Sequence, residues 1–368
     1  MSSQRIAVEV DEDGMLEARV VGANAFSGKV PMPLTAAADD LDVRLIRLFE
    51  RWLQVRGRPW IPAEIRTFGA LLHRALFPPE VWTWIRKASE GHALVRLTLT
   101  FPSESQHARL ASVPWEFLYQ PDKQFEQGWF LAGQHGYTLS RHIPSRRGIP
   151  HLDPIVRPRL LAIVSQPKTE QKVDADGVLA GIHDAAKQCD LEPEVVYSPS
   201  ATELGEIVAS WQPHLVQFMG HGRYDPGRGE GRLAFADPGG ETNWVPDARM
   251  ADLLVSPNWV PRAVVLHACD GGATDYEAGF AGVAPQLCRA GVQCVVAMQY
   301  PVTNNTATSF STTFYRELAR RQPPDVAVQT ARSVIAAPEI GAGLIGVPVV
   351  YLHSDDPLLA EPEQEGKQ

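Results

Sequence analysis

Two short stretches of this sequence bring reactive side chains to the ends of apolar runs. The run 264–266 leads to Cys269, which is followed by Asp270 and then by a pair of glycines. The run 215–219 leads in the same way to His221, which stands between two glycines. A cysteine attacks as the thiolate, and a neighbouring imidazole can remove its proton and stabilise the charge that results. The two stretches together therefore predict an activated cysteine nucleophile with a histidine partner.

The local pattern around both residues predicts where they lie in a fold. Short, β-branched-rich apolar runs bounded by Pro and Gly are typical of buried parallel strands. In open α/β sheets, ligands and catalytic groups gather at the carboxyl ends of the strands. The adjacent glycines would let backbone N–H groups approach a substrate carbonyl, as an oxyanion hole requires. We therefore expect His221 and Cys269 at one edge of a common sheet.

Other interpretations of the same residues remain open. A buried cysteine can be only a small hydrophobic side chain, and a histidine in a glycine-rich loop can be a turn residue. A chain with this fold could also be a non-enzymatic scaffold, because folds persist without their chemistry. A metal site is the third alternative, with ligands His214, His221, His267 and Cys269, although strand ends do not obviously bring four ligands together.

Composition narrows the class of protein. The chain has 368 residues and a formal net charge of −9, which argues against a phosphate-binding surface and therefore against direct nucleic-acid binding. Its four cysteines form no CxxC pair, so neither a zinc ribbon nor a disulfide scaffold is predicted. No leader-like segment and no run of 18 apolar residues is present, so we expect no membrane insertion and a cytoplasmic location.

The order of the predicted elements divides the chain. Residues 1–150 combine a β-hairpin, three helices and further strands, including a strand-like run over 129–142, and are predicted to form an α+β region. A Pro- and Arg-rich stretch, 144–158, is predicted to be a linker. Strands and helices then alternate through residues 156–355, which predicts a mostly parallel sheet with helices on both faces. A DPGG turn after His221 predicts a small hairpin near the site, and residues 356–368 are expected to be a disordered tail.

Several motifs, in order, connect the chain to a known family. They are VPWEFLY, LSRHIP, QFMGHG, VVLHACDGG and AGVQCVVAMQYPVTN. With these motifs the chain resembles the CHAT domain, a caspase-like module related to separases and metacaspases. HACDG also matches a caspase signature in its Ala, Cys and final Gly, with a histidine about 50 residues upstream. It departs from that signature at His267 and Asp270.

The resemblance implies a fold and an activity. The expected fold is α/β: a caspase-like, mostly parallel sheet flanked by helices, with an N-terminal α+β region. The expected activity is that of a cysteine endopeptidase without a cofactor. By similarity, His221 is the general base and acid, and Cys269 is the nucleophile. The backbone N–H groups of Gly222 and Cys269 would then hold the oxyanion.

The sequence specifies the substrate and the partners less closely than it specifies the fold and the activity. In relatives that cut after basic residues, an acid two positions before the nucleophile helps bind the substrate, and here that position holds His267. Asp270 and Asp225 are further candidates for a substrate pocket. Relatives often work as bacterial effector or defence proteases, so the resemblance implies a cytoplasmic protein substrate. The chain has no sensing repeat of its own, so the resemblance also implies an activating or sensor protein in trans.

Overall fold

The chain forms two compact units. The structure is a computed structural model that describes residues 2–359 except 36–40, 54–59, 103–107, 123–127, 134–135, 144–154, 156, 226–227, 229, 257, 269–278, 301, 337–341 and 354–356. The first unit comprises Met1–His142 and Ile335–Pro348. The second comprises Ile143–Val334 and Val349–Gln368. The chain therefore returns to the first unit after completing most of the second.

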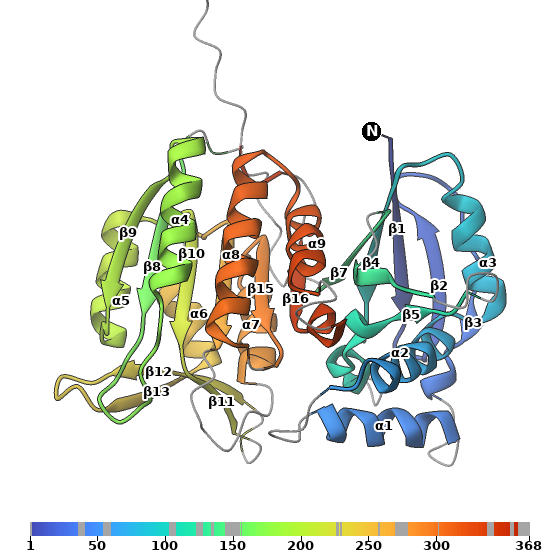
Figure 1. The fold of residues 1–368 in the computed structure, drawn as a ribbon, viewed down its shortest axis with the longest axis horizontal. Coiled ribbons are helices and arrows are strands. Elements are labelled where there is room, and N and C mark those ends of the chain that lie inside the picture. Colours follow the sequence, from blue (N-terminus) through green and yellow to red (C-terminus); the bar gives the residue numbers. More distant parts are fainter. Residues whose placement is uncertain are drawn as a thin grey trace, which may run out of the picture. The chain divides into compact units, whose positions relative to one another are not determined.

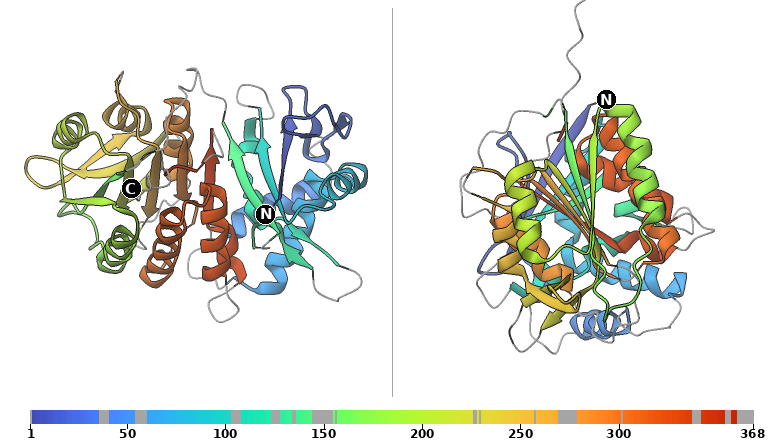
Figure 2. Two further views of the ribbon diagram at one scale, coloured as in Figure 1. Left: turned by 90° about the horizontal axis from the view of Figure 1, so that it is seen from above. Right: turned by 90° about the vertical axis from the view of Figure 1, so that its left-hand side faces the viewer.

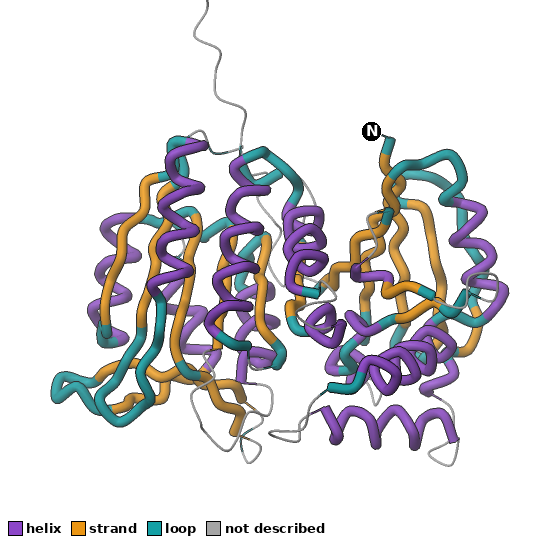
Figure 3. The backbone as a smooth tube through the Cα atoms, viewed as in Figure 1, coloured by secondary structure: helices purple, strands orange, loops and turns teal. Residues whose placement is uncertain are grey.

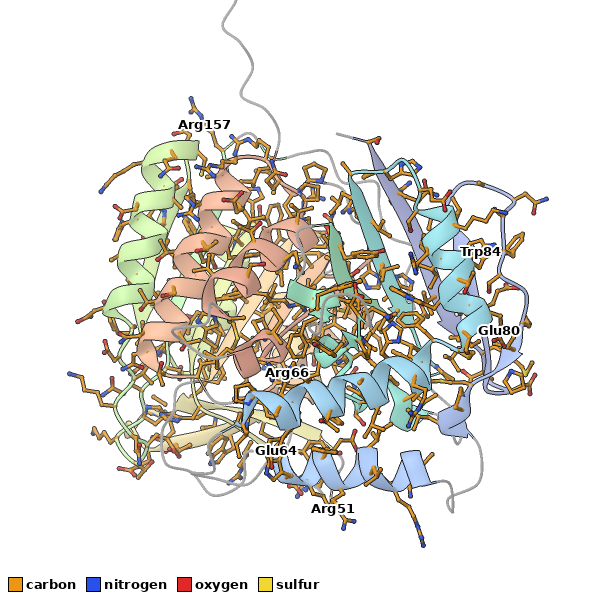
Figure 4. All side chains as sticks on the ribbon, turned by 45° about the vertical axis from the view of Figure 1, so that its right-hand side comes forward. Arg51, Glu64, Arg66, Glu80, Trp84 and Arg157 are labelled. Atoms are coloured by element: carbon orange, nitrogen blue, oxygen red, sulfur yellow. The ribbon has the colours of Figure 1, made fainter. Side chains whose placement is uncertain are left out.

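The first unit contains a five-strand sheet with the order β3-β2-β1-β4-β7. The predicted N-terminal hairpin is present, because β1 pairs antiparallel with β2, whereas β1–β4 and β4–β7 are parallel. Polar side chains such as Arg51, Arg66 and Glu80 lie on the outer surfaces of its helices (Figure 4). The elements are β1 (Ser3–Val10), β2 (Met15–Val20), β3 (Val30–Pro31), α1 (Leu41–Leu53), α2 (Pro62–Leu76), α3 (Pro79–Ala88), β4 (Leu94–Thr100), β5 (Tyr119–Gln120), β6 (Trp129–Phe130) and β7 (Tyr137–His142).

A buried ion pair joins two of the sequence motifs in this unit. Glu116 belongs to a short 3-10 turn, Trp115–Phe117, that begins after a proline. Arg141 of β7 donates from Nε to Glu116 Oε1 at 2.9 Å, and its other nitrogens bond two backbone carbonyls. The carboxylate is fully buried, so the pair must be complete to offset the cost of removing two charges from water. Glu116 therefore serves the scaffold of this unit.

One strand prediction in this unit was wrong. Residues 129–142 read as a single strand, but the structure has β6, then a 3-10 turn over Leu131–Gly133, then β7. Leu131 and Ala132 are both fully buried although they are consecutive. A turn places both side chains inward, whereas a strand would direct them to opposite faces.

The second unit is built on a six-strand sheet with the order β16-β15-β14-β10-β8-β9 (Figure 1). The pairs β8–β9, β8–β10, β10–β14 and β14–β15 are parallel, which confirms the predicted mostly parallel α/β sheet. Its elements are β8 (Arg159–Val164), α4 (Asp176–Cys189), β9 (Glu192–Tyr197), α5 (Ala201–Trp211), β10 (Leu215–Gly220), β11 (Gly222–Asp225), β12 (Glu230–Ala236), β13 (Thr242–Pro246), α6 (Asp247–Leu254), β14 (Ala263–Ala268), α7 (Gly279–Arg289), β15 (Cys294–Met298), α8 (Asn304–Ala319), α9 (Pro324–Ile335) and β16 (Pro348–Leu352).

Helices cover both faces of this sheet, and alternation along the strands decides which side chains meet them (Figure 2). Val216 and Phe218 of β10 belong to a core that includes side chains of α5, α6 and α7. The intervening residue Gln217 faces α8 and accepts a hydrogen bond from the hydroxyl of Tyr315 at 2.8 Å. His267 of β14 faces the same helix, with its ring 6.0 Å from that of Phe310. Odd-numbered positions of β10 and β14 therefore face α8.

The end of the chain differs from expectation. Leu358 and Leu359, inside the stretch expected to be a disordered tail, are buried. Leu359 also forms an isolated parallel bridge with Ile155, inside the expected linker. The expectation of disorder was wrong at these residues. Burial of two adjacent leucine side chains is favourable, even though the sequence on either side of them is polar. Residues 360–368 and most of 144–158 lie outside the described residues.

Candidate active site

The carboxyl ends of β10 and β14 meet at one edge of the sheet. Their parallel register pairs Gly220 with Ala268. The residue that follows Gly220 is His221, and the residue that follows Ala268 is Cys269. Cys269 and Asp270 lie outside the described residues. The register therefore ends both strands at the same level of this edge, as the sequence predicted for β10 and β14.

This edge is also a point where the connections diverge. The loop after β8 leads to α4, which packs against α8, whereas the chain after β10 leads to α6 on the other face. β8 and β10 are neighbours whose connections leave this edge in opposite directions, which makes it a topological switch point. In open α/β sheets such a switch point is where ligands bind. His221 follows β10 at this point.

The imidazole of His221 is held by a backbone carbonyl. The side chain is buried, with 2% of its surface exposed, and its Nε2 lies 2.8 Å from the carbonyl oxygen of Gln171. A carbonyl oxygen can only accept, so Nε2 carries the proton and donates it. In the neutral imidazole Nδ1 is then the acceptor. The histidine is thus fixed in the tautomer that leaves Nδ1 able to take a proton.

The segment that supplies this carbonyl is itself tied down. We name residues 166–175, which link β8 to α4, the strap. The backbone N–H of Lys168 donates to the carbonyl of Gly240 at 2.8 Å, and the N–H of Thr242 donates to Thr169 Oγ1 at 3.0 Å. Figure 3 shows this loop running beside the turn between β12 and β13. The hairpin predicted near the site therefore anchors the strap that orients His221.

The same hairpin sets the backbone on the other side of His221. β11, β12 and β13 form a three-stranded antiparallel sheet. The N–H of Ala234 donates to the carbonyl of His221 at 3.0 Å, so His221 and Ala234 are a hydrogen-bonded pair. The next pair, Gly222 and Leu233, is then a non-hydrogen-bonded pair. The N–H of Gly222 consequently points away from β12, as an oxyanion donor must.

Asp225 is less suited to a pocket than its sequence position indicated. It ends β11, and its carboxylate lies 3.4 Å from Arg232 and 3.9 Å from Arg228. Its charge is therefore shared with two guanidinium groups. A role in binding substrate stays a prediction for Asp225, as it does for Asp270.

His267 lies beside the site but is sealed from water. Its exposed fraction is 1%, and neither ring nitrogen has a hydrogen-bond partner among the described residues. Burial lowers the pKa of His267 to about 4, so the ring is neutral at physiological pH. It pairs in register with Met219, and its expected role in the substrate pocket stays a prediction.

The described cysteines do not offer a second nucleophile. Cys189, Cys288 and Cys294 are all buried. Burial raises the pKa of each of these thiols, so the reactive thiolate is disfavoured. The three cysteines that the structure describes are therefore structural residues.

The metal-site alternative loses one of its ligands. His214 precedes β10 and His221 follows it, so the two lie at opposite ends of a six-residue strand. The Nδ1 of His214 already accepts the backbone N–H of Arg159 at 3.0 Å. Among the residues that the structure describes, no three His, Cys, Asp or Glu side chains are grouped to hold a metal ion.

A family model matches most of this chain. The model of the CHAT domain matches residues 66–357, which include both strand ends of the site. The chain belongs to the CHAT domain family. Membership supports, at a coarse level, a caspase-like cysteine protease family. No curated protein matches the chain. Within the described part of this CHAT domain, no helix has the length and hydropathy of a membrane span.

Solved structures give more distant similarities. One is a chain of the Saccharomyces cerevisiae separase–securin complex, with a TM-score of 0.44 and 12% identity. That match covers 95% of the CHAT domain chain but only 30% of the other chain. Another is the Drosophila initiator caspase Dronc, with a TM-score of 0.41 and 10% identity, covering 60% of this chain and 95% of that one.

Two features of the site carried no sequence signal. The carbonyl of Gln171 belongs to the backbone, so no side-chain type marks it. The stacking of Arg223 on Trp244, 4.2 Å from guanidinium carbon to ring centroid, depends on the register of β12 with both its neighbours. The DPGG turn predicted a hairpin, and counting residues back from that turn could have suggested which side chains share a face.

Proposed function

We propose that this CHAT domain is a cysteine endopeptidase with a His221–Cys269 dyad. The observation that carries the proposal is the pairing of Gly220 with Ala268 on adjacent parallel strands. His221 and Cys269 each come one position after this pair in the sequence, and we propose that their side chains meet at this edge of the sheet.

The proposed mechanism uses His221 as base and then as acid. Nδ1 of His221 takes the proton of the Cys269 thiol, and the thiolate attacks the carbonyl carbon of the scissile peptide bond. The backbone N–H groups of Gly222 and Cys269 stabilise the oxyanion of the tetrahedral intermediate. The imidazolium returns its proton to the leaving amine, which leaves a thioester. Water, deprotonated by His221, hydrolyses that thioester and regenerates the thiol.

The carbonyl of Gln171 supports this assignment of roles. It accepts from Nε2 and so keeps Nδ1 as the acceptor, and it also stabilises the imidazolium formed after proton transfer. We further propose that the substrate is a cytoplasmic protein and that the chain is a bacterial effector or defence protease activated by a partner. These finer proposals follow from the family resemblance.

Thiol chemistry tests the dyad without a known substrate. Iodoacetamide labelling followed by mass spectrometry should modify Cys269 at neutral pH more rapidly than the buried Cys189. The His221→Ala variant should slow labelling of Cys269, because the base is lost. If labelling of Cys269 is unchanged in this variant, the dyad is refuted.

Cleavage tests the activity itself. New protein N-termini should appear when wild type is added to a bacterial lysate, and they should be absent with Cys269→Ala and His221→Ala. The Cys189→Ala variant controls for loss of an unrelated cysteine and should cleave like wild type. Identical termini with wild type and Cys269→Ala would instead favour the catalytically silent scaffold.

A further inference from the structure

The three-stranded sheet beside His221 carries an arginine that forms no ion pair with any residue that the structure describes. We propose that Arg223, stacked on Trp244, binds the carboxylate of an Asp or Glu side chain close to the scissile bond, so that substrates are acidic segments. This inference rests on the proposed function, because it concerns the same site. The sequence suggested the opposite possibility, a pocket made negative by Asp225 or Asp270.

Register places Arg223 on the face of the sheet that begins at His221. His221 lies opposite Ala234, and Ala234 lies opposite Trp244 on the next strand. Cross-strand partners share a face, and so do residues two apart along a strand. Arg223 is two residues after His221 and pairs with Arg232. The arginine, the tryptophan and the proposed base are therefore on one face.

The opposite face of this small sheet is closed. Leu233 and Phe235 of β12 and Val245 of β13 are buried in the core with side chains of α6 and α7. The face with Arg223 and Trp244 keeps half-buried polar and aromatic side chains. A substrate held by the N–H of Gly222 would meet this face first, because Arg223 is the next residue.

The cross-strand neighbours Arg223 and Arg232 differ in their ionic partners. The guanidinium of Arg232 lies 2.5 Å from Glu230 and 3.4 Å from Asp225, so its charge is neutralised within the sheet. Arg223 has no carboxylate within ion-pair distance among the described residues, and its contact is the ring of Trp244. Its positive charge is thus available to a ligand.

The stacking geometry suits a carboxylate. A guanidinium lying over an aromatic ring uses its flat face for the cation–π contact and keeps its N–H donors in the plane of the group. Those donors match the two oxygens of a carboxylate, and the ring fixes the guanidinium so that less entropy is lost on binding. Because an extended chain advances about 3.3 Å per residue, the acid would lie within about two residues of the scissile bond.

The net charge of the protein does not favour acidic substrates. With a net charge of −9, the protein as a whole repels acidic chains. Recognition of an acidic segment therefore depends on a specific guanidinium rather than on a general positive field. The association should weaken with salt, as expected for a pairing that is partly open to solvent.

Binding to a catalytically inactive variant tests the inference apart from cleavage. Full-length Cys269→Ala is titrated with a synthetic peptide library that carries Asp, Glu, Asn, Gln or Lys at each of the central positions. We expect the tightest peptides to have Asp or Glu at one position. Adding Arg223→Ala should weaken the best acidic peptide by about tenfold and its amide counterpart by less than about twofold. Arg223→Lys should retain part of the preference, and Arg223→Glu should transfer it to Lys peptides.

Arg249→Ala is the matched control. Arg249 is exposed on α6 and its loss changes the net charge equally, so acidic peptides should bind as before. Absence of any acidic preference, or equal losses with the Arg223 and Arg249 variants, would overturn the inference. If wild type cleaves peptides without acidic preference, the protease proposal stands and this inference fails. If acidic peptides bind through Arg223 but wild type cleaves none, the protease proposal fails and the binding site remains.

Discussion

His221 donates from Nε2 to the backbone carbonyl of Gln171, a residue 50 positions earlier in the chain, at 2.8 Å. The contact joins the strand that ends at His221 to the strap that follows β8. Backbone and side-chain hydrogen bonds to the β12–β13 turn and to Thr242, the first residue of β13, hold the strap. The orientation of the imidazole therefore depends on three segments that meet only in the folded chain.

Loosening the strap should reduce turnover. Thr242→Val removes the hydroxyl that lies 2.5 Å from Thr169 Oγ1 and also donates to Glu170 at 3.0 Å. We expect kcat on a cleaved peptide to fall by about tenfold with little change in KM, because misplacing a base costs rate more than binding. Thr242→Ser keeps the hydroxyl and Gln171→Ala keeps the carbonyl, so both should resemble wild type. A change in KM alone would contradict this role.

The buried ion pair should be costly to break. Glu116→Ala leaves Arg141 buried without its carboxylate, and we expect a loss of about 3–5 kcal/mol in the free energy of unfolding, measured with urea. Lys187→Ala breaks an exposed pair on α4 and should change stability little. Similar midpoints for both variants would show that the Arg141 guanidinium finds compensation elsewhere.

Stability should fall in mild acid because of His267. The folded protein holds this ring neutral, with a pKa of about 4, whereas the unfolded chain takes up a proton below about pH 6.5. Unfolding therefore becomes easier as pH falls from about 6.5 to 4, by up to about 3 kcal/mol.

Replacement of this histidine should flatten that dependence. Urea unfolding of His267→Leu at several pH values should show a smaller loss between pH 6.5 and 4 than wild type. The exposed His183 on α4 provides a control, since His183→Gln should keep the wild-type slope. An unchanged slope in His267→Leu would mean that other groups, such as the half-buried His214, dominate.

Close packing of α4 against α8 should not tolerate a side chain at Gly181. A Cβ there would lie 2.4 Å from Thr312 Oγ1 and 3.1 Å from Thr312 Cα. We expect Gly181→Ala to lower the melting temperature, at a cost of about 1–3 kcal/mol, and Thr312→Ala to relieve part of that loss in the double variant. Gly205→Ala on α5 is the control. Its Cβ would meet only Leu253 Cδ2 at 3.2 Å, so helix propensity should offset the contact.

Local pattern in the sequence was sufficient to predict the strands of the parallel sheet. The runs 215–219 and 264–266 are largely apolar and glycines follow each of them, so the strand ends near His221 and Cys269 could be placed. The alternation of strands and helices predicted the parallel sheet for the same reason, because each element is encoded by residues close together in the chain.

Tertiary structure alone decided which groups meet. The pairing of Gly220 with Ala268 depends on strand order and register, which no local window contains. The carbonyl that orients His221 is a backbone atom and leaves no trace in residue type. That Arg223 lacks a carboxylate partner within the described part of the chain becomes clear only from the structure, in which Arg232 pairs with Glu230 and Asp225. Contacts between distant segments are settled by how their buried faces pack, whereas sequence patterns report only which faces are to be buried.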